Sequence, residues 1–506
     1  MEENSKPVIG IVIPWFGRAE RGGAELHAWN LAEQLSSRGC RIEVLTTCCK
    51  SYHDDWSTNH HPAELTIEPE GFSVRRFPVE NRNRSEFDRV CSHLLGIEAK
   101  ELKPGVSPLP PDDEQIFSDH LIRCPALLGF LKSHGANYAT FIFLPYLYGP
   151  ILEGLPIVAA KSFLQPCLHD ESYAYLRKVQ DIFYAARGLL WISEGEFELG
   201  KKLFGPGIIP KSTITGAGVE SIKTVLGEES ESLSHLKPFL ILLGRKDEGK
   251  GTILAAESFR NFREQNPNSN LNLVIAGPGE LNLKDQSSRI HDLGLVSENE
   301  RAWLLSNAIG LLQPSPNESF SRVIFEAWQC RKPVVWRRTC LATSRAVQAC
   351  SGGWEAEIRD EWTAAIARFD QSSFSELDSM GEKGQKYASI ISNWESVMDR
   401  YDSALQPILN DTYVSLFIEC TFESLVEQTI SIRVGEQELG SWDLSPKTQL
   451  ELAPIRDDKT YSSGEISITT DKQHQHYGED PRKLGFHLKN NGVKNESNEE
   501  VLLQLI

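Results

Sequence analysis

The chain has 506 residues, which predicts about three domains at roughly 150 residues each and excludes a single ordinary core. Hydrophobic residues make up 40% of the chain and charged residues 24%, as in globular proteins. The formal net charge of -18 argues against nonspecific nucleic-acid binding as the main activity, because the phosphate backbone attracts basic surfaces.

The first residues and the cysteines predict a cytoplasmic protein. Residues 1–6 are polar and acidic, unlike the start of a signal peptide. The ten cysteines include no C-x-x-C pair, and the adjacent Cys48 and Cys49 lack the spacing of a metal clip. We therefore expect reduced, buried thiols and no metal site.

The chain opens with a β-α-β pattern. The apolar run Val8–Pro14 is typical of a strand buried on both faces, Ala24–Arg38 reads as a helix, and Arg41–Thr47 is the next strand. This pattern predicts a parallel, doubly wound sheet that binds its ligand where strands end and helices begin. Gly22 and Gly23 lie at that place and would let the backbone approach a phosphate, although a tight turn explains them equally well.

The apolar region from Tyr138 to Ala160 has the length of a membrane span. Its three prolines and two glycines would disrupt a spanning helix. We predict instead two buried strands, Thr140–Leu144 and Pro156–Ala160. Residues 50–115, which are rich in His, Asp, Asn, Pro and Arg, are expected to lie along one side of a cleft.

His169 follows a strand-like segment that begins at Ser162 and is adjacent to Asp170 and Glu171. A single histidine is often structural. Loops at the carboxyl ends of strands commonly carry functional groups, so we predict a site role for His169. Another buried strand, Gly188–Ser193, follows.

A second series of strands and helices starts at Phe239–Leu243. This strand runs into the sequence GRKDEGKG, residues 244–251, and then into a helix, Thr252–Glu264. Arg245 and Lys250 in the glycine-bracketed loop can place two cations on a diphosphate. The loop does not match the P-loop pattern, which argues against an ATPase.

Two further strands end at the same rim of this second sheet. Leu271–Ala276 is followed by a glycine loop, and Ile309–Leu312 leads into the segment Pro314–Trp336. The carboxyl ends of parallel strands share one edge of a sheet. Four candidate residues therefore share that rim: Arg245, Lys250, Gly277 and Glu318.

The spacing of Glu318 and Glu326 suggests a nucleotide-sugar pocket. Apolar residues from Phe320 onward follow a helical period, and eight helical residues rise about 12 Å, close to the span of a pyrophosphate with a sugar at each end. Free backbone N–H groups at a helix start favour phosphate. Here these would be the N–H groups of Ser319, Phe320 and Ser321. An ordinary surface helix that carries two acids remains an equal alternative.

The remaining sequence predicts a closing helical region and a β-rich module. Residues 361–405 have a helical pattern, and residues 411–506 contain short strand-like runs typical of an antiparallel β-sandwich. The predicted organisation is an N-terminal Rossmann-like domain (1–221), a linker (222–237), a second Rossmann-like domain (238–390), a closing helix (391–410) and a β-sandwich (411–506).

Five motifs in order resemble glycosyltransferase family 4, which has the GT-B fold. They are GGAE at 22–25, GRKDEGKG at 244–251, the GPG loop at 277–279, residues 290–308, and ESFSRVIFE at 318–326. The resemblance covers roughly residues 7–405. It implies α/β architecture with two Rossmann-like domains facing across a cleft, of which the first holds the acceptor and the second holds the donor. The run DPRKLGF at 480–486 resembles accessory β-sandwiches of some bacterial members.

The resemblance also implies roles for the candidate residues. Arg245 and Lys250 resemble the cations on the donor diphosphate, and Glu318 resembles the residue that orients the donor sugar. Glu326 resembles the acceptor for the ribose hydroxyls, whereas Gly23 and His169 resemble groups that the opposite domain offers. The sequence departs from the family at Ser321, where many members have glycine, and after Pro333, where no glycine-rich turn follows.

The function so implied is a retaining transfer of a sugar from a nucleotide-diphosphate sugar to a hydroxyl of a glycan or lipid-linked acceptor. The sequence contains no D-x-D, which agrees with metal independence, and no cofactor is expected beyond the donor. A sugar-nucleotide 2-epimerase and a non-catalytic carbohydrate-binding protein are the alternatives. Peripheral contact with the inner face of the membrane and self-association through the β-module are left open, as are the base, the sugar and the acceptor.

Overall fold

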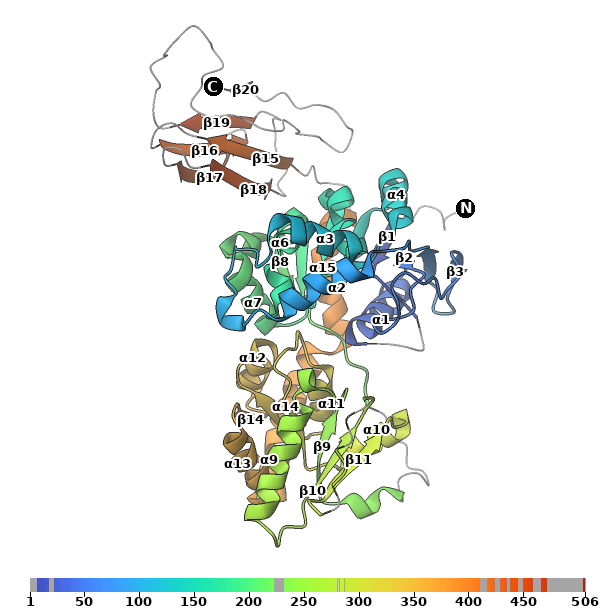
Figure 1. Cartoon of the computed structure of the whole chain (residues 1–506), viewed down its shortest axis with the longest axis vertical. Helices are drawn as coiled ribbons and strands as arrows, with labels where there is room; N and C mark the ends of the chain where they lie inside the picture. Colours follow the sequence, from blue (N-terminus) through green and yellow to red (C-terminus); the bar gives the residue numbers. More distant parts are fainter. Residues whose placement is uncertain are drawn as a thin grey trace.

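The computed structural model describes residues 7–17, 22–222, 232–279, 281, 283–285 and 287–409, and the strands of the C-terminal region. Figure 1 shows two α/β domains, one above the other, with the C-terminal strands beyond the first. No helix of the described part is both long and apolar enough to cross a bilayer.

The N-terminal domain contains a sheet of eight strands in the order β3-β4-β2-β1-β5-β6-β7-β8. All neighbours are parallel except β3 and β4. Alternate side chains along one strand enter different cores: Phe141 and Phe143 pack on one face, and Ile142 packs on the other. The strands are β1 (Val8–Val12), β2 (Arg41–Thr47), β3 (Leu65–Ile67), β4 (Ser73–Phe77), β5 (Thr140–Phe143), β6 (Ser162–Leu164), β7 (Gly188–Trp191) and β8 (Ser212–Ile214).

Helices cover both faces of this sheet, as burial on both sides of a parallel sheet requires. Figure 1 shows α1 on one side and α2, α3 and α6 on the other. The helices are α1 (Gly23–Ser37), α2 (Arg84–Leu95), α3 (Pro111–Leu121), α4 (Pro125–His134), α5 (Gly149–Leu152), α6 (Arg177–Ala185) and α7 (Glu194–Phe204).

The second domain has a parallel sheet of six strands in the order β11-β10-β9-β12-β13-β14. Two cores again cover its faces, with Ile241 in one and Leu240 in the other. Its strands are β9 (Phe239–Leu243), β10 (Asn272–Ala276), β11 (Ile290–Gly294), β12 (Gly310–Gln313), β13 (Val334–Arg337) and β14 (Gly353–Ala356). Its helices are α9 (Thr252–Gln265), α10 (Glu298–Asn307), α11 (Arg322–Gln329), α12 (Leu341–Cys350), α13 (Arg359–Gln371) and α14 (Phe374–Ile391).

Helix α15 (Trp394–Leu409) returns the chain to the first domain. Its buried side chains Val397, Met398 and Tyr401 belong to the same core as β1 and α1 of the N-terminal domain. The prediction of two Rossmann-like α/β domains is therefore confirmed, and the closing helix packs on the domain opposite to the one that precedes it.

Among the described residues of the C-terminal region, six strands form two sheets. One sheet pairs β15 (Leu416–Glu423) with β18 (Gln449–Asp457), and these strands are antiparallel. The other has the order β17-β16-β19-β20, and its ranges are Gln437–Leu444, Gln428–Val434, Ile466–Thr470 and Gln504–Leu505. The packing of a β-sandwich stays a prediction. The 480–486 run lies outside the described residues.

Two predicted elements are wrong in position. The segment Pro156–Ala160 is not a strand but part of a 3-10 helix, Leu155–Lys161, and the strand beside β5 is β6. Pro156 lies at the start of that helix, where its missing N–H is tolerated. Helix α11 begins at Arg322 and not at Phe320, because Ser321 before it has a left-handed backbone.

Candidate functional site

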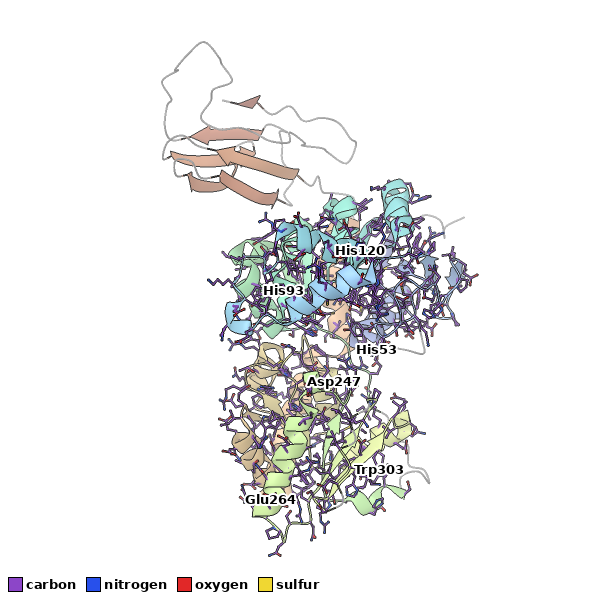
Figure 2. All side chains as sticks on the ribbon, viewed as in Figure 1. His53, His93, His120, Asp247, Glu264 and Trp303 are labelled. Carbon is purple, nitrogen blue, oxygen red and sulfur yellow. The ribbon has the colours of Figure 1, made fainter. Side chains whose placement is uncertain are left out.

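A cavity of about 960 Å³ lies between the two domains. Its lining comes mainly from α1 and the loops after β1, β2, β5 and β6 in the first domain, and from the loops after β9, β10 and β12 in the second. In Figure 2 the side chains of His53 and Asp247 mark the facing edges of the two domains. The cavity thus lies where the carboxyl ends of both parallel sheets meet, as expected for doubly wound folds.

Arg245, Lys250 and Glu318 line the second domain's side of this cavity. Lys250 Nζ lies 2.6 Å from Glu318 Oε1, and Arg245 Nε lies 3.5 Å from Asp247 Oδ2. Gly251 allows the loops of Lys250 and Glu318 to come this close. It has a φ of 69°, and a Cβ there would lie 2.5 Å from the carbonyl oxygen of Pro314. The two loops that sequence analysis assigned to one rim therefore touch.

The loop 319–321 also lines the cavity. Ser321 has a φ of 63° and a ψ of 71°, and its Oγ accepts a hydrogen bond of 2.6 Å from Gln313 Nε2. A left-handed backbone favours glycine at this position, which gives a physical reason for the family's preference. The N–H groups of Ser319, Phe320 and Ser321 precede the helix instead of forming its first turn.

Gly277 does not line the cavity, although its neighbour Pro278 does. Gly277 has a φ of 143°, and a Cβ there would lie 2.0 Å from the carbonyl oxygen of Gly244. The glycine is therefore required for the close approach of two backbones. A contact of Gly277 with donor phosphate stays a prediction.

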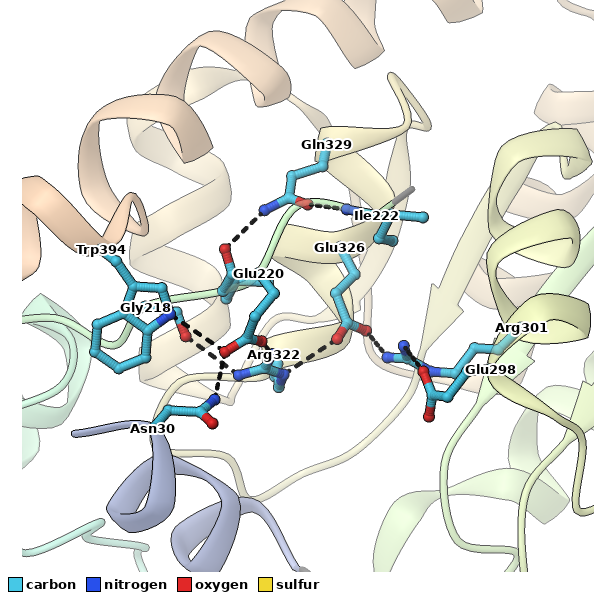
Figure 3. A network of polar contacts seen from close by, with 11 residues as sticks. Asn30, Gly218, Glu220, Ile222, Glu298, Arg301, Arg322, Glu326, Gln329 and Trp394 are labelled. Atoms are coloured by element: carbon cyan, nitrogen blue, oxygen red, sulfur yellow. Dashed lines mark hydrogen bonds and ion pairs between the residues drawn. The ribbon is translucent and has the colours of Figure 1, made fainter. Parts of the chain in front are cut away.

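Glu326 also lies away from the cavity lining, with only 2% of its surface exposed. Its carboxylate pairs with Arg301 and, at 3.2 Å, with Arg322 Nε (Figure 3). Two arginines satisfy the buried charge, which would otherwise carry a large desolvation cost. The role on the ribose stays a prediction, and in this structure Glu326 is an ion-pair residue.

Arg322 continues this network to the connection between the domains. Its guanidinium pairs with Glu220 and donates a hydrogen bond of 3.2 Å to the carbonyl oxygen of Gly218. Glu220 also accepts hydrogen bonds from Asn30 of α1 and from Trp394 of α15 (Figure 3). The connection between the domains is therefore tied to α11, the helix that follows the cavity-lining loop 319–321.

Gly22, Gly23 and His169 line the cavity from the first domain. Gly22 is the N-cap of α1, and a Cβ on Gly23 would meet nothing within 4 Å. His169 Nδ1 lies 3.7 Å from Glu171 Oε1, which also accepts a 2.7 Å hydrogen bond from the hydroxyl of Tyr146. The structure thus brings these three predicted residues to the side opposite Arg245 and Lys250.

Sequence reasoning missed the carboxylate that holds the loop of His169. Glu196 is buried and accepts backbone hydrogen bonds from Leu168, at 2.6 Å, and Ile192, at 2.7 Å. Burial raises the pKa of Glu196 to about 8. The only sequence signal is its place near the start of a helix, where an acid is common.

His27 was also missed, because it lies within a helix that reads as ordinary core. Its side chain is buried, lines the cavity, and has Nε2 3.2 Å from the hydroxyl of Tyr401 in α15. Burial lowers the pKa of His27 to about 4, so the imidazole is uncharged at neutral pH. This contact joins α1 to the returning helix.

Four aromatic side chains of the first domain also line the cavity, and the sequence did not indicate them. They are Trp15, Tyr52, Tyr146 and Tyr148. Tyr146 and Tyr148 share the loop after β5, whereas Trp15 and Tyr52 come from two other segments, so no local spacing could have indicated that all four lie together. Among the described residues, no three His, Cys, Asp or Glu side chains are gathered as metal ligands.

Residues 237–369 match the family model for glycosyl transferases of group 1. No curated protein matches the sequence. This matched segment contains Arg245, Lys250, Gly277, Glu318 and Glu326. The segment that resembles group 1 glycosyl transferases therefore lies in the second of the two α/β domains.

Solved structures of similar fold cover both domains. Sucrose-phosphate synthase from Thermosynechococcus elongatus is 14% identical with a TM-score of 0.58, and the match covers 80% of this chain and 100% of that chain. A trehalose-phosphate synthase from Burkholderia xenovorans is 10% identical, with a TM-score of 0.57 and coverage of 79% and 100%. HepE of Anabaena is 13% identical, with a TM-score of 0.54 and coverage of 79% and 99%. The likeness confirms the GT-B arrangement.

Proposed function

We propose that the protein is a retaining glycosyltransferase that moves a sugar from a nucleotide-diphosphate sugar to an acceptor hydroxyl without a metal. The observation that carries this proposal is the placement of Arg245, Lys250 and Glu318 together on the cavity, within the segment that matches the group 1 model. Structures of similar fold support a nucleotide-sugar donor, since HepE is described in complex with UDP and glucose.

The donor's diphosphate would lie against Arg245 and Lys250. An ammonium group has three donors, and Glu318 occupies one of those of Lys250 in this structure. Lys250 can therefore hold Glu318 and a phosphate oxygen together. Two cations next to the leaving group stabilise the negative charge that develops as the glycosidic bond breaks.

Glu318 would orient the donor sugar by accepting hydrogen bonds from its hydroxyls. Its side chain is largely buried, at 12% exposed, so those hydrogen bonds would form away from bulk water. The acceptor hydroxyl would attack from the face that the diphosphate leaves, and a phosphate oxygen would take its proton. No carboxylate nucleophile is assigned.

His169, Gly22 and Gly23 would complete the site from the opposite domain. Because the cavity lies between two domains, closure would bring the two sides together on the donor. The network from Glu326 through Arg322 to Glu220 supports this motion, since it joins the helix behind the donor loop to the interdomain crossing. Membrane contact, self-association and the role of residues 411–506 stay predictions.

Binding of a panel of nucleotide sugars to the purified full chain tests the proposal. We expect at least one to raise the melting temperature, because a ligand that binds only the native state stabilises it. The bound donor is then incubated with EDTA, with and without candidate acceptors, and the anomeric configuration of any product is read by NMR. Absence of binding by every donor, inversion, or full loss of transfer with EDTA would contradict the proposal. Conversion of the donor without acceptor would instead indicate an epimerase.

A further inference from the structure

The first domain's side of the cavity differs chemically from the second domain's side. We call it the acceptor wall and define it by the lining residues Trp15, Glu25, Tyr52, Tyr146, Tyr148 and Glu171. These residues come from the loops after β1, β5 and β6, from the segment after β2, and from α1. None of them is one of the residues proposed to contact the donor diphosphate, Arg245 and Lys250.

Aromatic rings form one part of the acceptor wall. The Trp15 ring lies 4.7 Å from that of Tyr148 and 6.3 Å from that of Tyr52, with edge-to-face angles of 68° and 64°. Tyr52 is 53% exposed and lines the cavity, so part of its side chain is accessible to a ligand there. An exposed ring held against other rings is a surface on which the C–H face of a sugar can pack.

Carboxylates form the other part. Glu171 Oε1 accepts from Tyr146, and its side chain is 32% exposed. Glu25 accepts a hydrogen bond from Trp15 Nε1. An ionised carboxylate has about four lone-pair positions, so both acids keep capacity to accept hydrogen bonds from hydroxyl groups.

The two sides of the cavity carry charges of opposite sign. Among the described lining residues, the first domain supplies the carboxylates of Glu25, Asp54 and Glu171 against a single Lys or Arg cation, that of Lys50. The second domain supplies the cations of Arg245 and Lys250 against the single carboxylate of Glu318, and its third lining cation, Arg322, is paired with Glu326 and Glu220 behind the cavity. A phosphate group is stabilised on the second side and repelled on the first.

We propose that the acceptor wall binds the acceptor as an uncharged saccharide, whose ring packs on Tyr52 and whose hydroxyls donate to Glu171 and Glu25. This inference rests on the proposed glycosyltransferase function. It assigns a substrate class: a neutral sugar, whether free or at the end of a glycoside, in preference to a sugar phosphate. A neutral ring meets carboxylates as hydrogen-bond acceptors, whereas a phosphate dianion meets them as like charges.

Paired acceptors that differ only in a phosphate group test the proposal. The full chain is incubated with its bound nucleotide sugar and with glucose or glucose 6-phosphate, fructose or fructose 6-phosphate, and octyl β-glucoside. We expect kcat/KM for a neutral acceptor to exceed that for its phosphate by at least about tenfold, or about 1.4 kcal/mol. The octyl glucoside separates a free saccharide from one attached to an apolar chain. Equal or better use of the phosphates, or transfer to no neutral sugar, would overturn the proposal.

Variants of one exposed residue assign the effect to the acceptor wall. Tyr52→Ala should raise the acceptor KM by about tenfold, because it removes the ring, whereas Tyr52→Phe should stay within about twofold. Ile67→Ala, on the exposed strand β3 and 81% exposed, is the matched surface control. An unchanged KM in Tyr52→Ala would contradict the assignment.

The Kd of the nucleotide sugar, measured by titration calorimetry on each variant, separates this inference from the proposed function. It should stay within about twofold in Tyr52→Ala, since the acceptor wall does not contact the donor diphosphate. Failure of the wild type to bind any nucleotide sugar would instead contradict the proposed function itself.

Discussion

The two sides of the interdomain cavity are built in different ways. The second domain's side comes from short segments that directly follow neighbouring parallel strands, and Lys250 meets Glu318 across two such loops. The first domain's side is assembled from Trp15, Tyr52, Tyr146 and His169, which lie in four separate segments. The difference teaches that the proposed diphosphate site follows from local loop chemistry, whereas the proposed acceptor wall depends on packing between distant segments.

The same contrast appears beneath the surface. Glu196 holds the loop of His169 by accepting two backbone hydrogen bonds. His27 contacts Tyr401 of α15, which lies 374 residues further along the chain. On the second side, Gln313 holds Ser321 through a hydrogen bond within the loop that leads into α11. The contact of His27 with α15 therefore ties the first side to a helix from beyond the second domain in the chain.

The largest effect is expected from the second side. Glu318→Gln removes the charge that pairs with Lys250 and weakens the hydrogen bonds to the donor sugar, so kcat should fall by about 100- to 1,000-fold. Steady-state transfer assays with the bound nucleotide sugar measure it. Glu264→Gln, at the exposed far end of α9 (Figure 2), is the matched control. Near-normal turnover in Glu318→Gln would show that the Lys250–Glu318 pair is structural.

An intermediate effect is expected from His27, a buried residue that supports the first domain's side of the cavity. The pKa of His27 is lowered from 6.5 to about 4 by burial, so its contribution to stability is present above pH 6.5 and is lost as the pH falls toward 4. Between pH 7 and pH 4.5 this loss should amount to about 2 to 3 kcal/mol. Urea unfolding of the wild type and His27→Gln at both pH values measures it.

The difference between the two proteins isolates His27 from the carboxylates that titrate in the same range. His93→Gln, at an exposed position on α2, serves as the control and should keep the wild-type pH dependence. If His27→Gln loses as much stability on acidification as the wild type, the burial of His27 does not cause the loss of stability at low pH.

The smallest effect is expected at Ser321. Ser321→Gly removes the left-handed backbone strain but also the hydrogen bond from Gln313, and each is worth about 1 kcal/mol. We therefore expect a change of less than about 1 kcal/mol in the free energy of unfolding, measured by urea titration. The exposed Ser351, with a φ of 56° at the end of α12, gives the comparison.

Ser351→Gly should stabilise the protein by about 0.5 to 1 kcal/mol, since glycine is favoured after a helix. A similar gain in Ser321→Gly would show that the hydrogen bond from Gln313 contributes nothing. A loss well above 1 kcal/mol would show that it outweighs the backbone strain.

Most of the α/β fold could be predicted from the sequence, because strands buried on both faces appear as continuous apolar runs. Val8–Val12, Phe239–Leu243 and Asn272–Ala276 are such strands, and each lies within its predicted range or coincides with it. The apolar run at Pro156–Ala160 was misassigned, since apolar content does not separate a strand from a short buried helix. The helix boundary at Ser321 depended on a backbone angle that residue identity does not reveal.

The sequence by itself determined that Arg245, Lys250 and Glu318 share one rim, because parallel strands place their following loops along one edge. Only the tertiary structure decided that Glu326 is buried between two arginines and that Gly277 packs on Gly244. It also decided that aromatic rings line the side of the cavity opposite Arg245 and Lys250. These outcomes depend on contacts between segments far apart in the chain. Sequence periodicity predicts on which face of its own helix or strand a side chain lies. Packing between elements decides which residues that side chain contacts.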